Sequence, residues 1–172
     1  PQPIPKGAGY IRNDRRIEEP MDFSKFNVFP LEAQQQILKS LVFDANVSTP
    51  RRFDLSPRQR TFLLRELAAK PLPENPDTHT KFLLHGANSP APGDPDPLMA
   101  SKSGMAYGYL TDNAYFQDEE NGVEFLLAAT IHVCANGIYN DDCYEYDTVG
   151  LPFLRELGLA VYRFESGLAQ RN

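Results

Sequence analysis

Near the middle of the chain runs the stretch Lys102-Ser103-Gly104-Met105-Ala106-Tyr107-Gly108-Tyr109-Leu110-Thr111-Asp112-Asn113-Ala114-Tyr115-Phe116. From Met105 to Gln117, aromatic and small residues alternate, which is typical of β-structure. Asp118 to Gly122 follows as an acidic turn, and Val123 to Val133 is an apolar run rich in residues that favour strands. The glycine near the end of the turn suits a hairpin. We therefore expect an antiparallel set of two or three strands.

Two helices are expected before this sheet. Over Pro30–Phe43, apolar residues recur at helical spacing, and proline is tolerated in the first turn of a helix. A second helix is expected to begin at Ser56, which can cap free amides, and Pro57, and to end at Pro71. Its predicted buried stripe consists of Phe62, Leu63, Leu64, Leu67 and Ala68.

A third helix is expected near the end of the chain, over Val149–Glu165, where helical periodicity returns. Its predicted buried side consists of Val149, Phe153, Leu157, Ala160, Val161 and Phe164. Between Pro71 and Pro97 the proline content forbids a long regular element, and only Lys81–His85 is a short strand candidate. This stretch is expected to be a connector.

The expected fold class is α+β, with helices followed by a small antiparallel sheet that a C-terminal helix covers. We divide the chain into three regions. Residues 1–29 are predicted to form an irregular leader that ends in a short extended piece. Residues 30–97 hold the two helices and the proline-rich connector, and residues 98–172 hold the sheet and the last helix.

The overall charge argues against polyanionic partners. The chain has a formal net charge of −6 and a pI near 5.1, so neither a nucleic acid nor an anionic membrane surface is an expected partner. No apolar run approaches the roughly 18 residues that span a bilayer. The first residues, Pro1–Pro5, lack the apolar core of a signal peptide, and the sequence reads as a trimmed piece whose export signal lay upstream.

The triplet Lys102-Ser103-Gly104, taken with the order of the elements, resembles the C-terminal half of class A serine β-lactamases and their penicillin-binding relatives, whose active sites carry a Lys-Ser/Thr-Gly triplet. Three further parts of the chain look like a branch of exported bacterial proteins usually labelled serine hydrolase: Tyr107–Asp112, Asn140–Asp142 with Tyr144–Asp147, and Gly150–Leu154. The resemblance covers residues 6 to 165 and implies a partial β-lactamase-like or transpeptidase-like fold.

The resemblance implies roles for four residues. The ammonium of Lys102 would attract the carboxylate of a bound ligand and lower the proton affinity of nearby hydroxyls, and the hydroxyl of Ser103 would donate to the same carboxylate. Gly104 would let the strand approach the ligand closely. The backbone amide of Met105 matches a donor of the oxyanion hole, and such a donor is worth about 3 kcal/mol. Without this context, Lys102 is an ordinary exposed strand lysine.

The nucleophile of that family is missing. No Ser-x-x-Lys occurs in the 172 residues; in the family this serine and its lysine come from an upstream helix. The deacylating glutamate and the Ser-Asp-Asn loop also lie upstream, and Thr111-Asp112-Asn113 is not that loop because it lies inside a strand after the triplet. We therefore expect a chain that is inactive alone and contributes one wall of a serine hydrolase site.

Several properties follow from the resemblance. It implies an exported protein, periplasmic or extracellular, that uses no cofactor or metal and takes a small-molecule or peptide substrate with a carboxylate. The family sheet has five strands, two from the N-terminal region, so three strands would expose an edge and an apolar face. The chain is then expected to dock its N-terminal half, to form a homo-oligomer, or to be marginally stable. Lys102 is expected on an inner strand, pointing into a cleft.

Two other hypotheses remain open. The chain could be a non-catalytic binding or structural module that kept the scaffold and uses the groove beside Lys102 to hold a peptide, glycan or carboxylate ligand. It could also be an unrelated small α+β domain with a chance triplet, in which case the last helix would not cover a sheet with the strand order of the hydrolases.

The remaining polar residues give weaker predictions. An acidic cluster could bind Ca²⁺ or form a self-hydrogen-bonded turn that orients the last helix, and the turn is favoured because the spacing is not that of an EF-hand. The cluster consists of Asn136, Asn140, Asp141, Asp142, Glu145 and Asp147. His79, His85 and His132 are expected at the surface or satisfied in the core. Cys134 and Cys143 could form a disulfide or stay free.

Overall fold

The computed structural model of the chain describes residues 2–72, 74–75, 78, 80–86 and 90–170. Within this part the fold is mixed α+β, with three α-helices and small sheets. Helix α1 spans Leu31–Val42, and two short 3₁₀ turns follow it, η1 (Asp44–Asn46) and η2 (Thr49–Arg51). The first predicted helix is therefore confirmed.

Helix α2 spans Pro57–Ala68 and begins with the predicted cap. The Ser56 hydroxyl accepts the amide of Gln59 at 3.4 Å, and the Gln59 side chain accepts the amide of Ser56 at 2.9 Å. This reciprocal capping box satisfies amides that the first turn leaves free. The predicted stripe is wrong in part, because Phe62 is 53% exposed and no residue of α2 is fully buried.

The main sheet is antiparallel, in the order β5-β6-β7. Strand β5 spans Leu98–Ala106, β6 spans Tyr109–Asp118 and β7 spans Val123–His132. The register runs without a bulge, from Leu98 opposite Gln117 in the first pair and from Tyr109 opposite His132 in the second. The acidic turn joins β6 to β7 as the sequence predicts.

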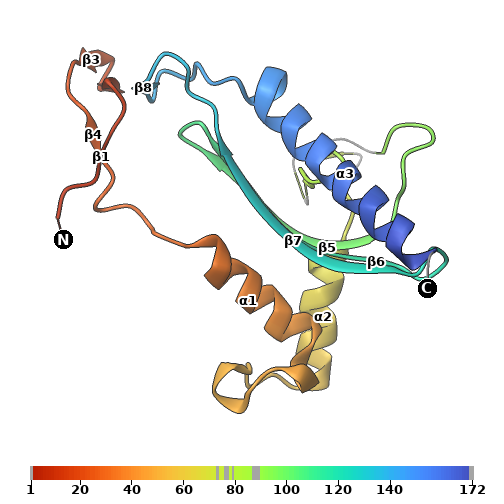
Figure 1. Ribbon diagram of the computed structural model, residues 1–172. Coiled ribbons are helices and arrows are strands. Elements are labelled where there is room, and N and C mark those ends of the chain that lie inside the picture. Colours follow the sequence, from red (N-terminus) through yellow and green to blue (C-terminus); the bar gives the residue numbers. More distant parts are fainter. Residues whose placement is uncertain (1, 73, 76–77, 79, 87–89, 171–172) are drawn as a thin grey trace.

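Helices cover both faces of this sheet, as Figure 1 shows, with α3 (Leu151–Ala169) on one face and α1 and α2 on the other. Because strand side chains alternate between faces, β6 contributes to two cores. On the α3 face the core includes Leu110, Ala114, Phe116, Leu154 and Leu159, and on the α1 face it includes Leu38, Ala100 and Tyr115. The expected closing helix over the sheet is thus present.

The predicted buried side of the last helix is wrong in part, since Leu157 packs against the core but three other members do not. The buried residues of α3 are Leu154, Gly158, Leu159 and Tyr162, and the apolar residues Val149, Phe153 and Phe164 are exposed. A π-helical turn, η3 (Tyr146–Gly150), precedes α3, so Val149 lies outside the α-helix. An apolar stripe is therefore left on the outer side of α3.

The Lys81–His85 segment is not a strand. Leu84 has a left-handed φ of 70° and belongs to no strand. Leu83 and Leu84 are nevertheless fully buried between the sheet and α3. Lys81–His85 is therefore an irregular segment between the sheet and α3, and we call it the crosspiece.

The N-terminal region contains more regular structure than the irregular leader that we expected. Strands β1 (Pro5–Lys6) and β4 (Met21–Asp22) pair with each other, whereas β2 (Gly9–Arg12) lies between β3 (Arg15–Ile17) and β8 (Ile138–Tyr139). The β2–β8 pair is parallel and joins residues far apart in sequence. In the described part of the chain, no helix has both the length and the apolar character needed to cross a bilayer.

Candidate functional site

Lys102 and Ser103 lie in β5, and β5 is an edge strand of the main sheet. The expectation of an inner strand is therefore wrong for the described residues, because β6 is the only strand there that pairs with β5. Lys102 is exposed, and its ammonium donates to the carbonyl of Ser103 at 2.6 Å. The ammonium thus folds back on the free edge of its own strand.

The two side chains leave β5 on opposite faces. Lys102 pairs with Asn113, which donates to the carbonyl of Gln34 in α1, so Lys102 is on the α1 face. Ser103 is on the α3 face, where its hydroxyl donates to the carbonyl of Thr80 at 2.6 Å. The structure therefore does not bring the two groups together on one face; a shared ligand would have to lie beside the edge.

The backbone of β5 presents the Met105 amide to that edge. The hairpin closes on Tyr107 and Gly108, both with φ above zero, and in a two-residue hairpin the flanking residues exchange hydrogen bonds. Because bonded pairs alternate with unbonded ones, Ala106 and Gly104 point their backbone groups toward β6, and Met105 and Ser103 point theirs outward. The Lys102 bond to the Ser103 carbonyl agrees with this pattern.

The turn end of β5 is also open to solvent. Met105 is 54% exposed, and a methyl group added to Gly104 would meet no atom within 4 Å. The Gly104 position thus has room for a ligand to approach the strand, although nothing in its surroundings requires glycine. Lys102, Gly104 and Met105 form an accessible row along the edge.

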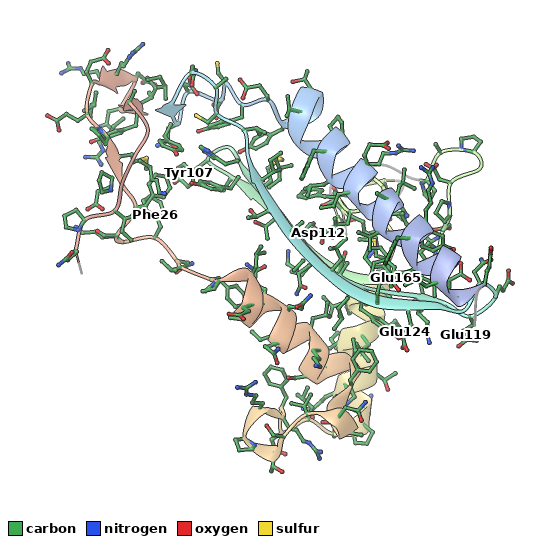
Figure 2. All side chains as sticks on the ribbon, in the orientation of Figure 1. Phe26, Tyr107, Asp112, Glu119, Glu124 and Glu165 are labelled. Carbon is green, nitrogen blue, oxygen red and sulfur yellow. The ribbon has the colours of Figure 1, made fainter. Side chains whose placement is uncertain are left out.

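An aromatic cluster stands at the end of this hairpin, where Figure 2 labels Phe26 and Tyr107. Tyr107 has a φ of 53°, which costs a bulky residue about 1–2 kcal/mol. Its ring makes edge contacts with Phe23 at 5.5 Å, Phe26 at 5.3 Å and Tyr139 at 6.5 Å between centroids. These contacts hold the N-terminal region against the open end of β5.

A buried carboxylate that sequence reasoning missed lies directly behind Ser103. Asp112 pairs with Ser103 across the strands, is fully buried, and accepts the amides of Phe82 at 2.9 Å and Leu83 at 3.0 Å. Burial raises the pKa of Asp112 to about 6, against the lowering effect of these amides. The available sequence signal was an acidic residue at a position of β6 that shares its face with Leu110 and Ala114.

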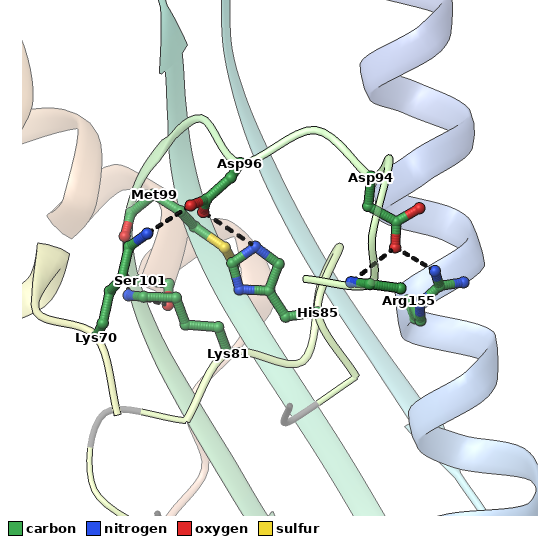
Figure 3. Close-up of polar contacts among 9 residues, drawn as sticks. Lys70, Lys81, His85, Asp94, Asp96, Met99, Ser101 and Arg155 are labelled. Carbon is green, nitrogen blue, oxygen red and sulfur yellow. Dashed lines mark hydrogen bonds and ion pairs between the residues drawn. The ribbon is translucent and has the colours of Figure 1, made fainter. Parts of the chain in front are cut away.

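Further polar groups surround the crosspiece, as Figure 3 shows. The Lys81 ammonium is buried and donates to the carbonyls of Met99 at 2.8 Å and Leu67 at 3.0 Å, and burial lowers the pKa of Lys81 to about 8. His85 is buried with no hydrogen bond to Nε2, which lies 3.8 Å from Asp96, and burial lowers its pKa. Lys81 therefore donates to the backbone carbonyl of Met99 on the free edge of β5, and Met105 lies further along the same edge.

The histidine predictions have mixed outcomes. His85 is buried without a hydrogen bond to Nε2, so it is not the satisfied core residue that we expected. His132 is exposed and stacks on Tyr109, with centroids 4.1 Å apart. His79 lies outside the described residues.

The acidic loop is held by its own hydrogen bonds. Asp141 accepts the side-chain amide of Asn136 at 2.7 Å and the backbone amide of Cys143 at 3.0 Å, and Glu145 accepts the amide of Ala135 at 3.1 Å. Among the residues that the structure describes, no group of three or more His, Cys, Asp or Glu side chains could hold a metal ion. Cys134 and Cys143 are both free thiols. The self-hydrogen-bonded turn is the interpretation that these contacts support.

Comparison of the chain with protein-family models, with curated proteins and with solved structures gives no match.

Proposed function

We propose that this chain is the C-terminal portion of an exported bacterial serine hydrolase of the β-lactamase-like kind. It would supply the Lys102-Ser103 wall of an active site, and the N-terminal half of the same protein would supply the Ser-x-x-Lys nucleophile. The reaction is acyl transfer or hydrolysis on a small-molecule or peptide substrate that carries a carboxylate. The chain alone is inactive.

The observation that carries this proposal is the open end of β5. The Met105 amide points outward along an exposed edge, two residues beyond the outward carbonyl of Ser103. An oxyanion donor has to be free, fixed by its strand and accessible to a reacting carbonyl, and the outward direction of this amide and the exposure of Met105 support that role. The ammonium of Lys102 lies at the same edge.

We propose that Lys102 and Ser103 contact one ligand from opposite faces of β5, because β5 is an edge strand. A ligand carboxylate lying beside β5 is within reach of side chains from both faces of the strand. Lys102 would leave the carbonyl of Ser103 and approach the carboxylate from the α1 face, where a charge-assisted bond is about twice as strong as a neutral one. Ser103 would turn its hydroxyl from Thr80 and donate from the α3 face.

The proposal that other polypeptide completes the sheet rests on β7 and α3. In the described part of the chain β7 pairs only with β6, although an exposed edge normally carries lysine, proline or a bulge. Before His132, its last residue, β7 has one charged side chain, that of Glu124. The side chains of Phe125, Leu126 and Leu127 in the same strand are half-buried. Phe153 and Phe164 are exposed on α3, which lies on one face of the same sheet.

A non-catalytic module on the same scaffold is the second candidate. One observation favours it: both polar side chains of the triplet already have partners within the chain, Lys102 with its own strand and Ser103 with Thr80. Such a module would hold a carboxylate ligand at the edge without any covalent step.

A covalent-labelling experiment separates the two candidates. A fluorescent penicillin should form no adduct with the isolated chain, and a stoichiometric adduct would contradict the assignment of a missing nucleophile. Mixed with the polypeptide that carries Ser-x-x-Lys, the chain should restore labelling of that polypeptide. Lys102→Ala should lower this labelling by tenfold or more, on the basis of about 1.4 kcal/mol or more for a charged bond.

A binding measurement tests the site itself. Benzylpenicillin titrated into the isotope-labelled chain should shift the amide resonances of Met105 and Ala106. Lys102→Ala should weaken that response, and Lys39→Ala, an exposed lysine on α1, is the matched control. If Lys102→Ala leaves every detectable response intact, the edge of β5 is not the site.

A further inference from the structure

A groove runs between α2 and the α1 face of the main sheet, at the end of the sheet where β5 begins. Figure 1 shows α2 lying against this part of the sheet. The groove has a volume of 790 Å³, and pockets that hold small organic molecules measure about 300–1,000 Å³. Apolar side chains form most of its wall; they are Val42, Leu64, Ala68, Ala69, Leu98 and Ala100.

The edge of β5 beside this groove is already occupied by a side chain. The Lys81 ammonium donates to the outward carbonyl of Met99 at 2.8 Å and to the carbonyl of Leu67 in α2 at 3.0 Å. An added strand needs free carbonyls and amides along the edge, so these bonds argue against an extended peptide as the occupant. The groove instead favours a ligand that binds through apolar contact.

Two arginines of α2 lie where the groove opens to solvent. Arg65 lines the groove, and its side chain is 73% exposed. A smaller hollow of 340 Å³ is lined by Arg58, Thr61, Phe62 and Arg65, which share one face of the helix. Because Thr61 and Arg65 line both, the smaller hollow adjoins the groove. The opening of the groove is therefore positively charged.

Both guanidinium groups can accept an anionic ligand. Among the residues that the structure describes, the Arg58 guanidinium has no hydrogen-bond or ion-pair partner. The Arg65 guanidinium lies over the Phe62 ring, 5.6 Å from its centroid, and contacts Glu66 at 3.2 Å. An exposed pair such as Arg65–Glu66 is weak, so a ligand carboxylate can compete with Glu66 for Arg65.

The sheet side of the groove has the opposite charge. Tyr115 lines the groove there, and its hydroxyl donates to the Glu124 carboxylate at 2.6 Å. A negatively charged ligand group would be repelled at this side and attracted at the α2 side. The groove is thus apolar along its length, with positive charge at its opening.

We propose that this groove binds a free monocarboxylate with a long alkyl chain, the chemical class of a fatty acid. The alkyl chain lies along the apolar wall, and the carboxylate accepts hydrogen bonds from Arg58 and Arg65, a geometry that guanidinium groups favour. The site goes beyond the proposed hydrolase function and is separate from the β5 edge at Lys102, which does not line the groove.

The first test titrates octanoate, decanoate and octan-1-ol into the isotope-labelled chain and follows the methyl resonances of Ala68 and Ala100. Each methylene that leaves water should tighten binding about fourfold, so the Kd of decanoate should be about tenfold or more below that of octanoate. Octan-1-ol lacks the charge and should bind about fivefold more weakly than octanoate. Equal affinity for octanoate and octan-1-ol, or no response to any of the three, would overturn the proposal.

The second test removes the positive charge. The double variant Arg58→Ala, Arg65→Ala should weaken octanoate binding about fivefold and leave octan-1-ol binding unchanged. Arg163→Ala, which changes an exposed arginine on α3, is the matched control. Lys102→Ala should also leave octanoate binding unchanged. Loss of binding in Lys102→Ala, with none in the double variant, would place the carboxylate at the β5 edge and overturn the proposal.

The third test fills the groove. Thr61→Trp places a large side chain where the groove and the smaller hollow meet, and it should weaken both octanoate and octan-1-ol by tenfold or more. Arg163→Trp is the control for a bulky exposed substitution and should change neither. Unchanged octanoate binding in a folded Thr61→Trp chain would overturn the site. The arginine variants change exposed side chains, so they decide the question if Thr61→Trp unfolds.

Discussion

A methyl group placed on Gly158, in the middle of α3, would lie 2.3 Å from the backbone nitrogen of Leu84. The neighbour is backbone, so it cannot move away as a flexible side chain would. Glycine in a helix interior costs about 1 kcal/mol relative to alanine, and here it allows the helix to reach the buried crosspiece. The close approach of Gly158 and Leu84 therefore sets the distance between α3 and the sheet.

Gly158→Ala is expected to lower the free energy of unfolding by about 2 kcal/mol or more, because the added methyl group overpacks the interface between α3 and Leu84. Gly167→Ala is the matched control in the same helix, since no atom lies within 4 Å of its added methyl group. That variant should be neutral or stabilise the fold by up to about 1 kcal/mol. Urea unfolding measures both, and effects of the same sign and size would contradict the packing argument.

Asp112→Ala is expected to destabilise the fold by about 2–4 kcal/mol, because the amides of Phe82 and Leu83 lose their buried acceptor. Asp54→Ala, an exposed residue, is the control and should change stability by less than about 0.5 kcal/mol. Hydrogen exchange locates the effect: the two amides should exchange faster in Asp112→Ala. Unchanged exchange at both positions would mean that Asp112 does not hold the crosspiece.

The pH dependence of stability should contain a contribution from Asp112. Burial raises its pKa from 3.8 to about 6, so the folded state holds this proton more tightly than the unfolded chain. The stabilising contribution is fully present below the unfolded value and is lost as the pH rises through about 6, by up to about 3 kcal/mol. Asn at this position cannot titrate.

The measurement compares the free energy of unfolding of the unchanged chain and of Asp112→Asn between pH 4 and pH 7. The difference between the two curves isolates Asp112, since His85 and the other groups titrate in both proteins. We expect this difference to change in favour of Asp112→Asn as the pH rises. A flat difference would show that the carboxyl has the same proton affinity in the folded and unfolded chain.

Local periodicity and turn chemistry predicted the helices and the sheet well. Pro30 and Ser56 precede the first residues of α1 and α2. Each affects only the first turn of its own helix, proline by restricting the backbone and serine by accepting a backbone amide. The acidic turn before Val123 predicted the β6–β7 hairpin for the same reason, whereas the turn at Tyr107-Gly108 interrupts the stretch Met105–Gln117 that alternation predicted as β-structure. These features depend on residues that are close in sequence.

Features that depend on distant partners were not predictable in this way. The side of α3 that is buried depends on the close approach of Gly158 to the backbone of Leu84. The regular structure of the N-terminal region depends on the pairing of β2 with β8. Likewise Lys102 and Ser103 are adjacent in sequence, so their identity indicated a shared ligand, but strand geometry sends them to opposite faces. That β5 lies at an edge of the main sheet likewise depends on pairing between strands.

Tyr107→Gly is expected to loosen the N-terminal region. Glycine would relieve the left-handed strain at this position, worth about 1–2 kcal/mol, but it would remove the ring contacts with Phe23, Phe26 and Tyr139. Burying an aromatic side chain contributes about 1.5–3 kcal/mol, and its edge contacts add to that value, so the loss exceeds the relief.

Limited trypsin digestion measures this loosening, because Lys25 lies between the two phenylalanines that Tyr107 contacts. Cleavage after Lys25 should be several-fold faster in Tyr107→Gly, with the β5–β6 hairpin still intact by hydrogen exchange. Phe29→Ala is the control, since its ring is 53% exposed and should leave the rate unchanged. Slower cleavage in Tyr107→Gly would mean that backbone strain at the turn outweighs the aromatic cluster.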